Sequence, residues 1–458
     1  MDKNRIGGYP LKGTIMKSNS SNDITKRFLT LFDSLEKQVN GRTIEPNHVF
    51  RRKAMAKLVE TPFPGRKDEN WKYTNVTRVL KPHYLTTAAS TGTRKTLPPD
   101  NRPSLNAYRL IFFNGVLQPA LSDLTALRKY VDVLPVSEAL RHIESKVEIE
   151  KYFYNNIDGA TNAFSLLNTA FAHNGWYIKI AEGVNLDKPI LVWHVIEPQL
   201  SSIFIHPQLI VVNEKDSEMQ LVEYFTSEKP KDSCLINSSV SFFLRQNARC
   251  QYYRIQNIDD QTFLIHQTSV SQDSHSRFDS NSLDLGGSVV RNNLEVILNQ
   301  SGSEAHLMGV YIASGNQHID NQTFIDHASP HCMSNELFKG ILGGHSKGVF
   351  NGKVLVRQDA QKTNAFQQNG NLLLSPTATM NSKPQLEIFA DDVKCSHGAT
   401  IGQLDEDALF YLQTRGLNRV EAKNILQYAF VGEVIERFTS QEVRELAEKL
   451  IHHKIHSL

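Results

Sequence analysis

The sequence predicts a mainly β protein whose core is a parallel β-helix, flanked by helical regions at both ends. Between about residues 205 and 395, short apolar runs recur roughly every 10–15 residues and are separated by Asn, Asp, Gly and Ser. No helical window interrupts this stretch. About 200 residues of strands is large for one sandwich, whereas in a solenoid each rung covers its neighbour. Since no strict repeat is visible, a long sandwich or two tandem β domains remain alternatives.

The N-terminal part of the chain has the pattern of helices. We expect a disordered tail over residues 1–20 and a helical region with a linker over 21–105. Apolar side chains recur at helical spacing within 23–38, at Ile24, Phe28, Leu31, Phe32 and Leu35. A second helix is expected over 48–60, and the two prolines of 61–65 end it. Residues 86–104 are rich in Thr, Ser and Pro, which is typical of an exposed linker.

We place the β-helix core at residues 106–400. Its clearest apolar runs lie at 209–212, 240–244, 289–298, 349–356, 372–374 and 386–389. A polar cluster interrupts them, formed by His318, Asp320, Asp326, His327, His331 and Cys332. Because the surrounding pattern is that of strands and turns, we interpret this cluster as structural turn residues and not as a metal site.

Residues 401–458 are expected to form a C-terminal domain of three helices. Acidic residues at 405–407 mark a helix start, where the helix dipole favours negative charge, and Gly416 can end that helix. Asn418 and Glu421 have the spacing of a capping box for the second helix. Thr439 with Glu442 marks the start of the third.

Composition limits the classes of function. The 458 residues carry 50 basic and 48 acidic side chains, a net charge of +2, so we expect no nucleic-acid partner. No apolar run approaches the roughly 18 residues of a membrane span. Four cysteines without a CxxC pair indicate a reducing compartment, and residues 1–20 have no apolar core of a signal peptide. We therefore predict a cytoplasmic protein.

The usual motifs of catalysis are missing from the sequence. Gly286-Gly287 and Gly343-Gly344 are not followed by helices and belong to no phosphate-binding loop, so we expect no ATP site in this chain. GxSxG and HExxH are absent as well. Asp391 and Asp392 are adjacent, and neighbours on a strand point to opposite faces, which weakens an acid–base pair. We expect a protein that is not an enzyme.

Cys395 and His397 are the strongest candidates for chemistry. On a strand their spacing places both side chains on one face, where a thiolate and an imidazole form a pair of metal ligands. A small buried cysteine beside a hydrogen-bonded histidine is the alternative. An iron–sulfur cluster generally takes about four ligands, and the other cysteines are far away in the sequence. If the pair binds iron or a cluster, a partner must supply the remaining ligands.

The chain resembles the SufB/SufD family of the SUF iron–sulfur cluster assembly system from about residue 24 to its C-terminus. The clearest match is Asp391–Thr400, which continues into Gly402–Asp405, Phe410–Leu412 and Arg415-Gly416. Other matching segments are Glu69–Thr74, Leu167–Ala170, Asp320–Thr323, Phe350–Gly352, Ala360–Ala365, Asn371–Ser375 and Pro384–Glu387. The forms of Glu69–Thr74 and Asp391–Thr400 are more similar to SufD than to SufB.

This resemblance implies a right-handed parallel β-helix and a scaffold role. It implies a complex with SufB, with which the chain would pair as a heterodimer, and with the ATPase SufC, which would dock on the C-terminal helices. The nascent cluster would form transiently between this chain and SufB, with His397 contributing and Cys395 beside it. We expect Tyr411, Arg415 and Phe438 to contact SufC, and a homodimer when the chain is isolated.

Two other functions remain open at this point. A SufB-like scaffold would accept sulfur on a cysteine within the β-helix, and Cys250 lies there. A β-helix enzyme acting on polysaccharides would use an acidic pair such as Asp391 and Asp392.

Overall fold

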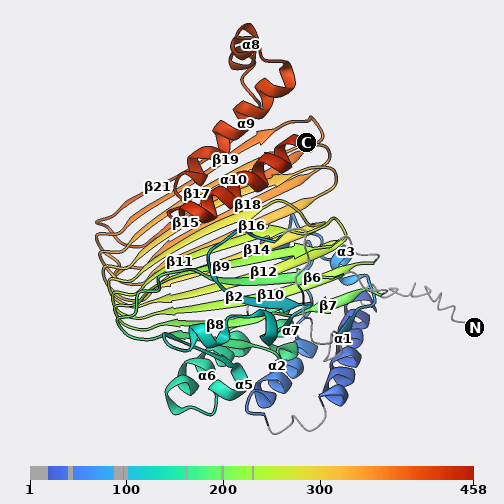
Figure 1. The fold of residues 1–458 in the computed structure, drawn as a ribbon, viewed down its shortest axis with the longest axis vertical. Coiled ribbons are helices and arrows are strands. Elements are labelled where there is room, and N and C mark those ends of the chain that lie inside the picture. Colours follow the sequence, from blue (N-terminus) through green and yellow to red (C-terminus); the bar gives the residue numbers. More distant parts are fainter. Residues whose placement is uncertain are drawn as a thin grey trace, which may run out of the picture.

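The computed structural model describes residues 19–39, 45–86, 96, 102–160, 162–197, 201–228 and 232–458. Its centre is a parallel β-solenoid of about seven turns, made of two facing sheets (Figure 1). Each turn of the chain adds one strand to each sheet. The predicted β-helix is therefore confirmed, and the sandwich and tandem-domain alternatives are wrong.

One sheet holds mainly even-numbered strands and is called the even sheet here. Its members are β1 (Leu85–Thr86), β4 (Val131–Pro135), β5 (Trp176–Ile180), β7 (Ile203–Ile205), β8 (Gln208–Asn213), β10 (Cys234–Leu244), β12 (Thr262–Gln272), β14 (Val289–Leu298), β16 (His318–His327), β18 (Lys347–Val356) and β20 (Thr379–Ile388).

The facing odd sheet is built in the same way from the intervening strands. Its members are β2 (Tyr108–Phe113), β3 (Val116–Leu117), β6 (Ile190–Ile196), β9 (Glu218–Ser227), β11 (Arg249–Asn257), β13 (Arg277–Asp284), β15 (Glu304–Ala313), β17 (Met333–Leu342), β19 (Asn364–Leu373) and β21 (Lys394–Gly402).

The length of each turn explains why no repeat is visible in the sequence. Cys234 on β10 is in register with Thr262 on β12, 28 residues later. Lys347 on β18 is in register with Thr379 on β20, 32 residues later. Because the loops absorb this variation, the strands stay aligned while the sequence period drifts.

A stack of similar turns joins the even sheet to the odd sheet. Each of these turns has one residue in the left-handed region, with φ between 57° and 78°, at Asp216, Asn247, His275, Gly302, His331 and Lys362. Its N–H donates to a carbonyl of the next turn, as from His331 to Gln361 at 2.9 Å. The interpretation of the polar cluster as turn residues is confirmed for His331 and wrong for four other members, which lie on β16: His318, Asp320, Asp326 and His327. Cys332 follows His331, and its thiol donates to the Gln300 carbonyl at 3.4 Å. This cysteine therefore stabilises the stack of turns.

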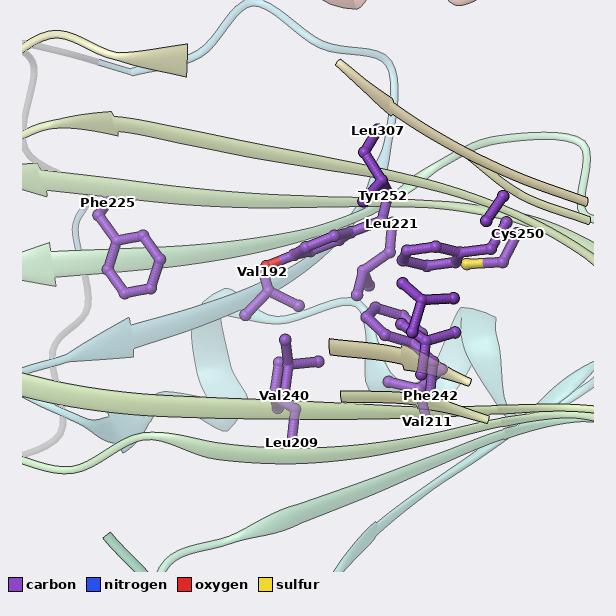
Figure 2. Close-up of a cluster of buried hydrophobic side chains, with 14 of the residues drawn as sticks. Val192, Leu209, Val211, Leu221, Phe225, Val240, Phe242, Cys250, Tyr252 and Leu307 are labelled. Carbon is purple, nitrogen blue, oxygen red and sulfur yellow. The ribbon is translucent and has the colours of Figure 1, made fainter. Parts of the chain in front are cut away.

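The space between the sheets, called the lumen here, is filled mainly by apolar side chains in the early turns. Figure 2 shows part of this core, in which Leu209, Val211 and Val240 of the even sheet face Leu221 and Tyr252 of the odd sheet. The alternation of the strands places every second residue in the lumen.

Helices cover the outer face of the even sheet at its early turns. They are α1 (Asn19–Gln38), α2 (His48–Glu60), α3 (Thr77–Leu80), α5 (Val136–Ala139), α6 (Ile143–Asp158) and α7 (Ala163–Phe171), and α4 (Leu124–Leu127) lies against the first turn of the lumen. The helices expected at 23–38 and 48–60 are confirmed. Most of the expected tail and linker lie outside the described residues.

Helices α5 to α7 were not predicted, although they lie within the expected core of 106–400. All nine residues of α7 but Ser165 are buried. The sequence of this helix therefore lacks the alternation of polar and apolar faces by which a helix is recognised. Asn168 of α7 donates to the carbonyls of Pro207 and Asn237 at 3.0 and 2.7 Å, which fixes the helix on the even sheet.

The predicted C-terminal helices are α8 (Glu406–Thr414), α9 (Arg419–Ile435) and α10 (Gln441–His456). The capping box of Asn418 and Glu421 is present, and Ser440, one residue after Thr439, precedes α10. Helices α9 and α10 pack on the outer face of the odd sheet, whereas α8 projects beyond the last strands (Figure 1). No helix in the described part of the chain is both long and apolar enough to cross a membrane.

Candidate functional site

The last turn of the solenoid leaves the lumen open at one end. Within the described residues, β20 pairs only with β18 and β21 pairs only with β19. The free edges of these two strands therefore present backbone N–H and C=O groups without a neighbouring strand. Eight of the nine residues of β21 are exposed, and Cys395 is the half-buried exception. We call β20, β21 and the lumen side chains between them the open end.

Cys395 and His397 lie together at the open end. Cys395 is in register with Ala365 of β19, and His397 is in register with Gln367, and both of these partners are buried in the lumen. The two candidate ligands therefore continue lumen columns and point to the same side of β21, as their spacing predicted. Partial burial raises the pKa of the Cys395 thiol, so a metal ion that binds it must displace a proton.

A metal ion at the open end would find only two ligands among the described residues. Among the described residues, no group of three or more His, Cys, Asp or Glu side chains is arranged to hold a metal ion. Cys395 and His397 supply two ligands of a type that suits iron or a cluster. Two ligands are fewer than the roughly four that a cluster generally takes.

Polar side chains continue inward from His397. Gln367 donates from Nε2 to the carboxylate of Glu336, which is in register one strand further in, on β17. Glu336 is buried, and this burial raises the pKa of its carboxyl to about 7. Gly352 of β18 leaves the room for this contact, since a Cβ there would collide with the Gln367 amide. Sequence reasoning missed Glu336 and Gln367, because nothing marks which alternate residues face the lumen.

The other three cysteines are buried, and two of them lie in early turns far from the open end. Cys234 and Cys250 line the lumen of the early turns, and Cys250 is one of the core side chains drawn in Figure 2. Complete burial raises the pKa of the Cys250 thiol far above its ordinary value. A buried, protonated thiol is a poor sulfur acceptor, so the structure does not favour the SufB-like alternative based on Cys250.

Asp391 and Asp392 belong to the last turn before β21. The Asp392 carbonyl accepts the N–H of Lys362 at 2.7 Å, and its carboxylate pairs with the Lys362 ammonium group. Asp392 therefore extends the stack of turns described above. This placement favours a structural role over the acid–base pair of a polysaccharide-active enzyme.

A segment from the N-terminal region crosses the outer face of the even sheet toward the open end. Trp71 lies 3.7 Å from the Arg291 guanidinium, measured to the ring centroid, and Arg291 pairs with Asp320 at 2.5 Å. Thr74 donates to the same carboxylate. At the tip of the segment, Glu69 pairs with Lys383 of β20 at 2.6 Å. Two segments of the family resemblance, 69–74 and 320–323, are thus partners in space.

The C-terminal helices present only part of the expected contact surface. On α8, Phe410 and Tyr411 are 69% and 56% exposed, and the Arg415 guanidinium lies 5.1 Å from the Tyr411 ring centroid. Phe438 is completely buried and packs on Tyr253 of β11, with 5.6 Å between ring centroids. Phe438 therefore holds the helices on the solenoid, and its buried ring is not available for contact with SufC.

Comparisons with known proteins agree with these features. The family model described as "SUF system FeS cluster assembly, SufBD core domain" matches residues 196–430, and the model of the SufBD protein N-terminal region matches residues 22–192. A SufBD family protein of Synechocystis is 32% identical over 82% of this chain and 83% of its own length. The SufD protein of Escherichia coli is 28% identical, over 85% and 89% of the two chains.

The chloroplastic protein ABCI7 of Arabidopsis thaliana is 29% identical over 92% of this chain and 89% of its own length. The two family models together cover the N-terminal helices, the solenoid and the start of the C-terminal domain. This chain belongs to the SufBD family of iron–sulfur cluster assembly proteins and is SufD-like within it.

Proposed function

We propose that this chain is a non-catalytic scaffold subunit of the SUF system that pairs with SufB through its open end and helps to form the nascent cluster there. The observation that carries the proposal is the position of Cys395 and His397. Both are side chains of types that bind metals, with no third such ligand beside them among the described residues, and they lie on a strand with one free edge at the end of the solenoid.

The edge of β21 is suited to pairing with another chain. Natural edge strands are usually protected by charge, proline or a covering element. Residues 398–402 of β21 carry no charge, and Ile401 is exposed. The edge of β20 differs, because it contains Lys383 and Pro384, and proline cannot donate a ladder hydrogen bond. We therefore expect the partner to add its strand to β21.

The metal ion or cluster is cargo at this site. The thiolate of Cys395 and the neutral imidazole of His397 would each be one ligand of the metal, and SufB would supply the other ligands. Because the ligand set closes only when both subunits are present, neither subunit alone should retain a cluster. A second copy of this chain could cover the same edge when SufB is absent, which would give a homodimer.

We place the contact with SufC on α8. Phe410 and Tyr411 are exposed aromatic side chains beside Arg415, and such residues dominate binding energy at interfaces. Helix α9 connects α8 to the solenoid, where Lys339 of β17 pairs with Glu433 at 2.5 Å and lies 4.7 Å from the Phe430 ring centroid. A movement of α8 caused by ATP hydrolysis in SufC would therefore reach strands next to the open end.

The test is co-expression of the chain with SufB and SufC. His397→Ala should leave the complex assembled, as measured by co-purification and size-exclusion chromatography, and should abolish the visible absorbance of the reconstituted cluster. His345→Ala is the control, because His345 is an exposed histidine in the turn before β18. Normal cluster formation by His397→Ala, or loss of cluster by the His345 variant as well, would contradict the proposal.

A further inference from the structure

We propose that Glu336 is a charge-balancing residue of the open end, whose buried carboxylate strengthens the binding of a cation by Cys395 and His397. This inference rests on the proposed function of those two ligands. It assigns to the site a third residue, two strands further in, that does not touch the cation.

The geometry places Glu336 directly inward of the ligands. Glu336, Gln367 and His397 are in register across β17, β19 and β21. Adjacent strands lie about 4.8 Å apart, so Glu336 is about 10 Å from His397 along this column. Gln367 lies between them on β19 and donates a hydrogen bond to the Glu336 carboxylate. Its own Oε1 atom is buried and has no hydrogen-bond partner among the described residues.

The side chains around Glu336 leave its charge without a fixed counter-ion. Its in-register neighbour on β15 is Leu307, and Thr323 of β16 and Gly352 of β18 lie on the facing sheet. Lys339 of β17 points to the outer face, where it pairs with Glu433 of α9.

Two further titratable side chains of the neighbouring strands face the lumen. Burial lowers the pKa of His327 on β16 to about 4 and raises that of Tyr311 on β15. Both are therefore uncharged near neutral pH. The nearest place from which a positive charge could approach Glu336 through the lumen is thus the open end.

A cation at the open end would complete this arrangement. Burial makes the ionised form of Glu336 costly, which keeps a proton on the carboxyl up to a pH of about 7. When the cation binds, the carboxyl loses this proton to solvent and becomes the counter-charge. For two unit charges about 10 Å apart at an effective dielectric constant of about 20, the attraction corresponds to roughly a tenfold gain in affinity or more.

The test measures binding of ferrous iron, under anaerobic conditions, to the complex of this chain with SufB at pH 6 and pH 8. Glu336→Gln should lower the affinity roughly tenfold at pH 8 and have little effect at pH 6, where the native carboxyl is already protonated. Glu336→Asp, which keeps the acid, should retain the steeper pH dependence of the native chain. Glu182→Gln, a change of an exposed carboxylate in the loop after β5, is the control.

The outcomes separate this inference from the proposed function. If Cys395→Ala and His397→Ala bind iron normally, the proposed function is wrong and Glu336 has no site to serve. If those variants lose iron but Glu336→Gln binds like the native chain at both pH values, only the role of Glu336 is wrong. An equal loss at pH 6 and pH 8 in Glu336→Gln would show a purely structural role and would also overturn the inference.

Discussion

Replacing Glu336 by glutamine should change how the stability of the isolated chain depends on pH. Burial raises the pKa of this carboxyl from its ordinary value of 4.5 to about 7 in the folded chain. Between these two pH values the unfolded chain has lost the proton and the folded chain still holds it. Because the folded state then binds more protons, the free energy of unfolding must fall as pH rises through this window.

The size of the effect follows from the two pKa values. They differ by about 2.5 pH units, and each unit corresponds to 1.36 kcal/mol, so the native carboxyl lowers stability by about 3 kcal/mol between pH 4.5 and pH 7. Glutamine keeps a similar shape and cannot ionise. The stability of Glu336→Gln relative to the native chain should therefore rise by about this amount across the window.

Urea denaturation at several pH values between 4.5 and 8 measures this difference. The comparison is valid where the two chains have the same dependence on urea concentration, because the same surface is then exposed on unfolding. Glu182→Gln again provides the exposed-carboxylate control. A stability difference between Glu336→Gln and the native chain that stays constant from pH 4.5 to 8 would refute the reasoning, because Glu336 would then not titrate in this window.

Two further predictions concern the parts that flank the open end. Arg291→Ala should destabilise the chain by about 3–5 kcal/mol in urea denaturation, because it leaves the buried Asp320 carboxylate without its ion-pair partner. Lys383→Ala breaks the partly exposed pair with Glu69 and should change stability by less than about 1 kcal/mol. Equal losses of stability in the two variants would contradict this account. Tyr411→Ala should weaken SufC binding in isothermal titration calorimetry without lowering the melting temperature. Phe438→Ala should instead cost about 3–5 kcal/mol of stability, because its ring is buried. A lowered melting temperature for Tyr411→Ala would argue against a contact role for Tyr411.

The sequence predicted the class of fold because its signals are local. Strand density in the core, helical spacing in 23–38 and the Asn418 capping box each depend on a few neighbouring residues. Helix α7 was missed for the opposite reason. It is buried on all sides between the even sheet and α2, and burial on every face erases the amphipathic pattern.

The candidate site was predictable only in part. Cys395 and His397 stand out as residue types with a meaningful spacing. Glu336 and Gln367 do not, since their roles depend on register between strands about 30 residues apart. The prediction for Phe438 was wrong for the same reason. An aromatic residue in the connection between α9 and α10 is a plausible anchor for a partner, and only its position over β11 shows that it faces Tyr253.

The two ends of the solenoid differ in a way that bears on how the chain could fold alone and still require a partner. At the first end, short strands β3 and β4 and helix α4 close the lumen, and they bring Leu117, Leu127 and Val131 into the core. At the open end the outermost lumen side chains include Ser382 and His397, which tolerate water. Apolar side chains lie beside them, since Ile388 and Ile401 are 39% and 50% exposed. The open end therefore presents both apolar surface and the unpaired backbone edge of β21. A partner that pairs with this edge would then bury polar groups, and buried polar groups need partners of their own. Binding a metal ion or cluster between the subunits would supply such partners for Cys395 and His397, so the mixed surface of the open end would favour an interface that closes around its cargo.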